Sequence, residues 1–246
     1  MATVSIPTSA VRWWSAVASV ASRDSARSAL TGVLVESGSV WHPICGQFVG
    51  VTLTATDSYR LMTVGIVDDS AESGSVLVPA RVKVPARAGV LSFVWDSGDD
   101  LRETVGTVYA DHLDRRDGVG SGDDLRPTVS VFTGETRTDV PQPANADVFP
   151  SWRNLIPDIG ALGAVESEPY AVNPDYLGAM LVAMGKAAGK DIPRLPVRCV
   201  ASSTNRPSLW EWVNDDRSVM ATGLVMPVRV PDADVLGYRD RAAVSS

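Results

Sequence analysis

The chain has 246 residues, of which 45% are hydrophobic and 21% charged, and its formal net charge is −7. This length and composition describe a globular protein with one large domain or two smaller ones, and the negative charge argues against a protein that binds nucleic acid over its whole surface. No apolar run approaches the roughly 20 residues of a membrane span, and the N-terminus lacks a basic segment followed by an apolar stretch, so we expect a cytoplasmic protein with no membrane partner.

The first part of the chain predicts a strand, a helix and three further strands. A short strand, TVSIP, precedes a helical run from Thr8 to Ser22, in which apolar residues recur every three or four positions from Val11 to Ala21. The strands that follow are ALTGVLVES, CGQFVGVTLTA and RLMTVGIV. One face of the helix is polar and free of acids; it carries Arg12, Ser15, Ser19 and Arg23.

The same order recurs twice more. The second unit begins with the strand SVLVP and has a helix-like segment, ARVKVPARAG, although Pro85 disfavours a helix interior; VLSFVWD, TVGTVYA and TVSVFTG are its further strands. In the third unit YAV precedes a helix that Asn173 caps and Pro174 begins, and PVRCVAS, SLWEWVN and TGLVMPVRV follow. The chain is therefore predicted to be an α+β protein built of three repeated βαβββ units.

The two cysteines of the chain are too few for a disulfide scaffold or a tetrahedral metal site. Cys45 and Cys199 both lie in apolar, strand-like stretches. We therefore expect them to be buried, reduced thiols, which suits a cytoplasmic location.

Three segments of this acidic chain, 1–23, 73–95 and 176–190, carry basic residues and no acid. Their basic residues are Arg12, Arg23, Arg81, Lys83, Arg87, Lys186 and Lys190. Basic helix faces lined otherwise by small residues attract phosphates without reading bases, and this attraction weakens steeply with salt. Ordinary solvated helix faces would produce the same composition, so the residues alone leave both interpretations open.

No constellation typical of an enzyme is present. His112 has acidic neighbours but lies in a turn-rich loop, and His42 has no partner nearby in sequence. Two GDD triplets fit turns better than metal sites, and there is no phosphate-binding loop, dinucleotide fingerprint or nucleophile elbow. We predict no enzymatic activity, no metal and no cofactor.

Five motifs resemble segments of the bacterial sliding clamp, the β subunit of DNA polymerase III. They occur in that family's order and with similar spacing. TATDSYRLM resembles the family's Ala-Thr-Asp-Gly-His-Arg-Leu segment, with Ser58 and Tyr59 in place of Gly and His. DVFPSWRNLIP resembles its interdomain linker, with Ser151 and Trp152 substituted. SVLVPAR, NPDYLGAML and VMPVRV resemble three further segments. The resemblance implies the DNA clamp fold, in which helices line an inner face and antiparallel sheets lie outside.

The resemblance also implies a division of the chain. Residues 1–145 resemble the family's middle domain, 146–157 its linker and 158–230 a shortened C-terminal half-domain, and 231–246 form a flexible tail. The family's first domain would then be absent. A clamp ring lined by about twelve helices would take three or four such chains, and the sequence leaves this number open.

In sliding clamps the segments named above form an apolar groove that binds short peptides of DNA polymerase and other replication proteins. Carried over to this chain, the groove residues would be Leu30, Thr56, Tyr59, Arg60, Leu61, Pro150, Asn154, Leu155, Val225, Met226, Pro227, Val228 and Arg229. Asp57 is expected instead to hold its turn by backbone hydrogen bonds.

The function implied is that of a processivity factor, a homo-oligomeric ring that encircles duplex DNA irrespective of sequence and tethers a polymerase. The alternative is a clamp-derived module that binds replication proteins without encircling DNA. A phage-infected or uninfected bacterial cell would be the setting of either.

Overall fold

The computed structural model describes residues 2–7, 10–84, 91–95, 128–133, 135–143, 149–156, 171–188, 198–203 and 206–228. Predictions that fall outside these residues concern the strand TVGTVYA, the tail 231–246 and three site residues, Arg87, Lys190 and Arg229. No helix in the described part is both long and apolar enough to cross a membrane.

The helical elements are α1 (Val11–Ala18), the 3₁₀ helices η2 (Ser25–Thr31) and η4 (Trp152–Leu155), and α3 (Pro174–Ala188). The strands before the linker are β1 (Ala2–Ile6), β2 (Gly32–His42), β3 (Gly46–Thr56), β4 (Arg60–Val67), β5 (Gly74–Pro79), β6 (Leu91–Trp95), β7 (Thr128–Thr133) and β8 (Thr136–Pro141). Those after it are β9 (Ala171–Val172), β10 (Arg198–Ser203), β11 (Arg206–Val213), β12 (Val219–Val225) and β13 (Pro227–Val228).

The strands form antiparallel sheets that cross the boundaries of the three predicted units. A seven-stranded sheet has the order β10-β11-β12-β4-β3-β2-β5, and a four-stranded sheet has the order β1-β6-β7-β8. The pair β12 and β4 runs from Val219 opposite Ile66 to Val225 opposite Arg60, so it joins the third unit to the first. The short strands β9 and β13 form a separate pair. The α+β class is confirmed.

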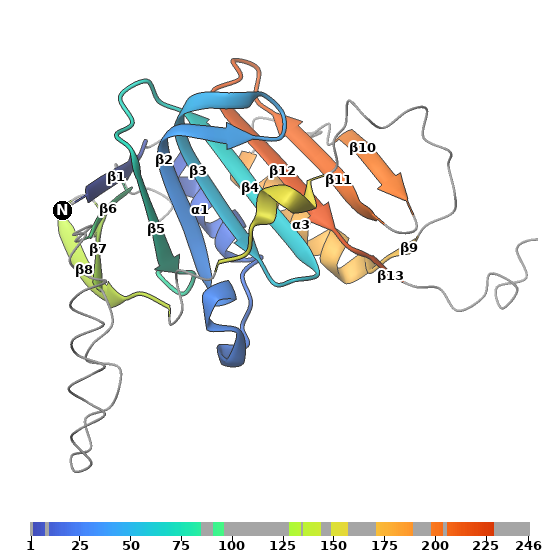
Figure 1. The fold of residues 1–246 in the computed structure, drawn as a ribbon, viewed down its shortest axis with the longest axis horizontal. Helices are drawn as coiled ribbons and strands as arrows, with labels where there is room; N and C mark the ends of the chain where they lie inside the picture. Colours follow the sequence, from blue (N-terminus) through green and yellow to red (C-terminus); the bar gives the residue numbers. More distant parts are fainter. Residues whose placement is uncertain are drawn as a thin grey trace, which may run out of the picture.

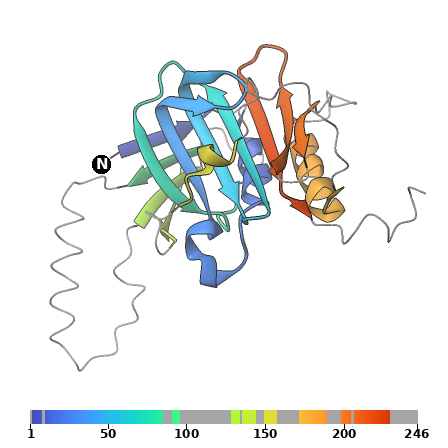
Figure 2. The ribbon, with the colours of Figure 1, turned by 45° about the vertical axis from the view of Figure 1, so that its right-hand side comes forward.

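Both helices lie side by side on one face of the seven-stranded sheet, behind the sheet in Figure 1, and Figure 2 shows α3 beside the orange strands. Alternate strand residues point to this face, which is why Val33, Leu53 and Val64 belong to one buried core with α1. Trp13 of α1 meets Trp212 of β11 with ring centroids 5.0 Å apart. Gly223 allows α3 to approach, because a Cβ there would collide with Met180.

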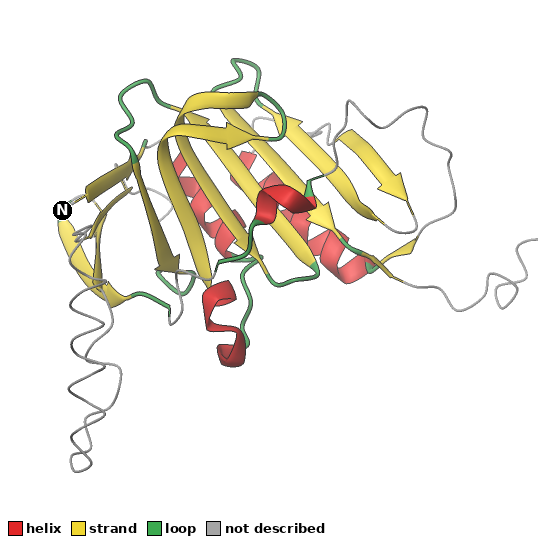
Figure 3. Cartoon of the chain, in the orientation of Figure 1, coloured by secondary structure: helices red, strands yellow, loops and turns green. Residues whose placement is uncertain are grey.

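The opposite face of the sheet is covered by the linker, whose η4 turn crosses it in Figure 3. Trp152 is buried there in a second cluster with Leu61, Leu209 and Leu224. These three leucines lie opposite one another on β4, β11 and β12. Both faces of the central strands are therefore covered, and every residue of β12 is buried.

The structure confirms some predicted elements and corrects others. The helix of the first unit is present as α1, and the Asn173 side chain accepts a hydrogen bond from the Asp175 amide (2.9 Å) at the start of α3. In the second unit, residues 80–84 are a turn and irregular chain rather than helix. TGLVMPVRV is not one strand, because β12 and β13 belong to different sheets.

Two further corrections concern the strand β8 and the two cysteines. The strand β8 was not predicted, since its polar sequence, TRTDVP, shows no apolar alternation. Both cysteines are exposed, so the prediction of buried thiols is wrong. Cys45 lies in the turn between β2 and β3, where partial burial raises the pKa of its thiol.

Candidate functional site

The TATDSYRLM segment forms the turn between β3 and β4, and Asp57 organises it. One carboxylate oxygen of Asp57 accepts the amides of Tyr59 (3.0 Å) and Arg60 (2.9 Å), and the other accepts the Arg60 Nε (3.0 Å). The Thr56 hydroxyl donates to the Arg60 carbonyl (2.8 Å), and Ser58 has a φ of 78°. The structural role expected for Asp57 is confirmed.

Arg60 links this turn to both helices. Its guanidinium donates to the Ser19 carbonyl at the end of α1 (3.3 Å) and lies 5.3 Å from the centre of the Tyr176 ring on α3. The Tyr176 ring also stacks on Tyr59, with centroids 5.7 Å apart. Tyr176 is not among the predicted site residues, although its position in the first turn of a capped helix within NPDYLGAML was a signal.

Several large apolar side chains of the described residues are exposed, and some of them belong to the predicted groove. The large hydrophobic residues that are exposed in the described part are Val49, Tyr59, Val67, Leu155, Val182, Met226 and Val228. Four of these seven, Tyr59, Leu155, Met226 and Val228, are predicted groove residues. The Met226 amide donates to the Tyr59 carbonyl (2.8 Å), so the end of β12 is joined directly to the turn.

The other predicted groove residues fall into three groups. Buried members are Leu30, Thr56, Leu61 and Val225. Half-buried members are Arg60, Pro150 and Pro227, and Asn154 is exposed. Leu61 packs against Trp152 and therefore supports the surface from beneath, whereas Met226 is 38% exposed and lies on it.

The linker is attached to the sheet by an ion pair that the sequence analysis missed. The Arg153 Nη2 donates to both carboxylate oxygens of Glu36 on β2, each at 2.9 Å. The same guanidinium lies 4.6 Å from the centre of the Trp152 ring. The partners are 117 positions apart, so no local signal could have found the pair.

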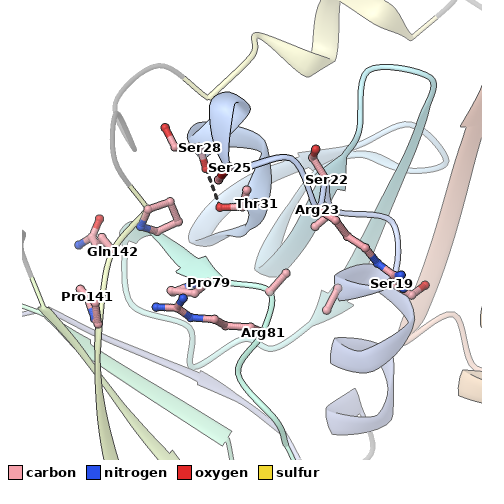
Figure 4. Close-up of a pocket in the computed structure, with 14 residues that line it drawn as sticks. Ser19, Ser22, Arg23, Ser25, Ser28, Thr31, Pro79, Arg81, Pro141 and Gln142 are labelled. Carbon is pink, nitrogen blue, oxygen red and sulfur yellow. Dashed lines mark hydrogen bonds between the residues drawn. The ribbon is translucent and has the colours of Figure 1, made fainter. Parts of the chain in front are cut away.

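Arg23 of the first basic segment and Arg81 of the second come together at the C-terminal end of α1. A cavity of about 680 Å³ lies between α1, η2 and the ends of β5 and β8, and Arg23 and Arg81 line it (Figure 4). The described residues that line it include hydroxyl groups of Ser19, Ser22, Ser25 and Thr31 but no acid. A second hollow, of about 460 Å³, is lined by Ser15, Ser19, Arg81 and Lys83.

The remaining described residues that were predicted to face DNA lie on the two helices. Arg12 on α1 and Lys186 on α3 are both exposed. Because these helices pack side by side on one face of the sheet, both charges lie on the same side of the sheet.

Two helices packed on one face of a continuous antiparallel sheet, with a linker crossing the other face, define a protein with the sliding-clamp fold. The solved structures that it resembles include bacterial DNA polymerase III β subunits. One is the β chain of Streptococcus pneumoniae, with a TM-score of 0.57, 14% identity and coverage of 94% of this chain and 65% of that one. Another is the β subunit of Thermotoga maritima, with a TM-score of 0.56, 12% identity and coverage of 93% and 66%.

A third similar structure is the β clamp of Helicobacter pylori in complex with diflunisal, with a TM-score of 0.52, 14% identity and coverage of 92% and 66%. The chain thus spans 65–66% of the length of these three proteins. No family model matches the sequence, and no curated protein matches it either. The likeness lies in the fold.

Proposed function

We propose that this chain is a DNA polymerase processivity factor, which encircles duplex DNA as a homo-oligomeric ring and tethers replication proteins. The role is one of binding, without catalysis. The observation that carries it is the clamp fold together with the exposed apolar side chains of Tyr59, Leu155, Met226 and Val228. They include residues from the turn, the linker and the last strands, the same segments that form the peptide groove in sliding clamps.

The chemistry of this surface suits a short apolar peptide. Met226 offers a flexible thioether that adapts to different side chains, and Leu155 and Val228 offer branched apolar ones. Polar groups nearby, such as Asn154, would set the register of the peptide. Tyr59 is bulkier than the histidine it replaces in the family motif and narrows the range of residues that fit beside it.

Contact with DNA is supported by the basic residues. Arg23, Arg81 and Lys83 surround the end of α1 in hollows whose described lining has no acid. Serine hydroxyls, guanidinium groups and ammonium groups bind phosphate oxygens, and contacts to phosphate carry no sequence information. The proposed binding is therefore independent of DNA sequence and sensitive to salt.

The peptide site is tested with a fluorescein-labelled peptide containing Gln-Ala-Ala-Leu-Phe. We expect the wild-type chain to bind it and Met226→Asp to abolish binding, because a carboxylate cannot be desolvated against an apolar side chain. Val67→Asp is the matched control, since Val67 is exposed to a similar extent (41% against 38%) but lies at the other end of β4. Equal loss in both variants, or no binding by the wild type, would refute the site.

The alternative is a clamp-derived module that binds such peptides as a monomer. Light scattering separates the two, because a ring requires a discrete multimer at micromolar concentration. A stable monomer that still binds the peptide would favour the alternative and exclude encirclement.

A further inference from the structure

Among the described residues, one ion pair connects the linker to the first half of the chain. One nitrogen of Arg153 bridges both oxygens of Glu36 at 2.9 Å, and the Thr52 hydroxyl donates to one of those oxygens (3.4 Å). The Glu36 side chain is 19% exposed and that of Arg153 40%, so the carboxylate is held in a defined place while water still reaches the guanidinium.

Arg153 acts on its neighbour Trp152 as well. Its guanidinium lies over the indole, whose ring is buried between Leu61 and Leu224 and also contacts Trp41 of β2 (centroids 6.0 Å apart). The indole Nε1 has no hydrogen-bond partner among the described residues, so packing and the cation above it hold the ring.

The residues under Trp152 are sequence neighbours of the exposed surface. Leu61 directly follows Arg60, and Leu224 precedes Met226 by two positions. On the linker itself, Leu155 follows Arg153 by two positions. The ion pair therefore fixes the linker two residues before its exposed leucine.

We propose that Glu36 and Arg153 are positioning residues for the peptide site, a role that rests on the proposed function. With the pair intact, η4 is held on the sheet, and Leu155 contacts the same bound peptide as Met226. Without the pair, the linker samples other positions and only a fraction of the molecules present a complete surface. The apparent dissociation constant then rises in inverse proportion to that fraction.

The test compares Glu36→Gln, Arg153→Gln, the double variant and the exchanged pair Glu36→Arg/Arg153→Glu. With the Gln-Ala-Ala-Leu-Phe peptide, we expect each single variant to raise Kd roughly three- to tenfold through the reduced competent fraction. The double variant should equal Arg153→Gln, because Glu36 has no ion pair left to lose once Arg153 is replaced. The exchanged pair should recover most of the affinity.

Arg137→Gln is the matched control, because Arg137 forms an ion pair with Asp139 at the same 2.9 Å but on the outer strand β8. It should leave Kd unchanged. Urea unfolding of every variant supplies the second measurement: a purely structural role would lower the midpoint in Glu36→Gln while Kd stayed at the wild-type value. That result would overturn the inference.

Failure of the inference differs from failure of the proposed function. If the wild type binds the peptide, Met226→Asp does not, and both single variants bind as tightly as the wild type, only the positioning role is refuted. If the wild type does not bind, the proposed peptide site fails and the positioning role with it. Recovery of peptide affinity by the exchanged pair supports both the positioning role and the proposed peptide site.

Discussion

The ring of Tyr59 stacks on that of Tyr176, with the two planes 19° apart, and so joins the turn after β3 to the first turn of α3. Arg60 lies over the same Tyr176 ring, 5.3 Å from its centre. Three side chains from two distant segments therefore support one another at the edge of the exposed apolar surface.

This stack predicts an energetic coupling between the two tyrosines. In a double-mutant cycle of Tyr59→Ala and Tyr176→Ala, urea unfolding should give a coupling of about 0.5–1.5 kcal/mol, as for other aromatic pairs. Tyr176→Ala alone should cost more than Tyr59→Ala, since it also removes the cation–π contact of Arg60. Additive effects of the two substitutions would show that the rings do not stabilise each other.

The second prediction concerns pH, through His42. Burial lowers the pKa of His42 from its ordinary 6.5 to about 4, so the imidazole is neutral in the folded protein. Its Nδ1 accepts the Ile44 amide (3.3 Å), which leaves the proton on Nε2, near the Thr63 carbonyl (3.5 Å).

Because the folded pKa lies below the unfolded one, the unfolded chain binds more protons between these two values. The stabilisation is complete above pH 6.5 and is lost as the pH falls toward 4, by about 3 kcal/mol. Urea unfolding at intervals of pH measures it. His42→Phe should lack this part of the pH dependence, and identical slopes in the two proteins would contradict the neutral, buried state.

A third prediction compares two glycines. Gly223→Ala should destabilise the protein by about 1–3 kcal/mol, because the added methyl group would collide with Met180 and with Met184 beneath α3. Gly178→Ala, on α3 with open space around it, should stabilise by about 0.5–1 kcal/mol through helix propensity. Thermal or urea unfolding of both variants checks that their changes in stability have opposite signs. Changes of the same sign would contradict the close packing of α3 against Gly223.

The fourth prediction uses Trp152. Trp152→Ala should cost about 3–5 kcal/mol, because it leaves a cavity among the buried leucines. Trp152→Phe should cost much less, since the indole nitrogen has no hydrogen bond to lose among the described residues. Comparable losses in the two variants would mean that the indole N–H is engaged, contrary to the structure.

The fifth prediction belongs to the proposed DNA contact. Arg81→Gln should reduce the slope of log Kd against log salt by about one for duplex DNA, and Arg23→Gln/Arg81→Gln by about two. Arg137→Gln, whose side chain lines neither hollow, is the control. Fluorescence anisotropy with duplexes of two unrelated sequences gives the slopes. Unequal affinities for the two sequences would argue against binding that ignores bases.

Much of the fold was accessible from the sequence, because it depends on interactions between near neighbours. The spacing from Val11 to Ala21 identifies the buried face of α1, and the order of Asn173, Pro174 and Asp175 identifies the start of α3. The turn held by Asp57 is equally local, since its acceptors and donors lie within three positions.

The sequence by itself determined most of the strands, the helices α1 and α3, the clamp-like order of motifs and the segments that carry basic residues. The tertiary structure alone decided that Tyr176 meets Tyr59, that Arg153 reaches Glu36, and that Arg23 and Arg81 share a cavity. It also decided that the cysteines are exposed and that the polar strand β8 pairs with β7. The reason is physical: periodicity, capping and turns are set by short-range geometry, whereas side chains far apart in the chain meet only after the sheet has brought their strands together.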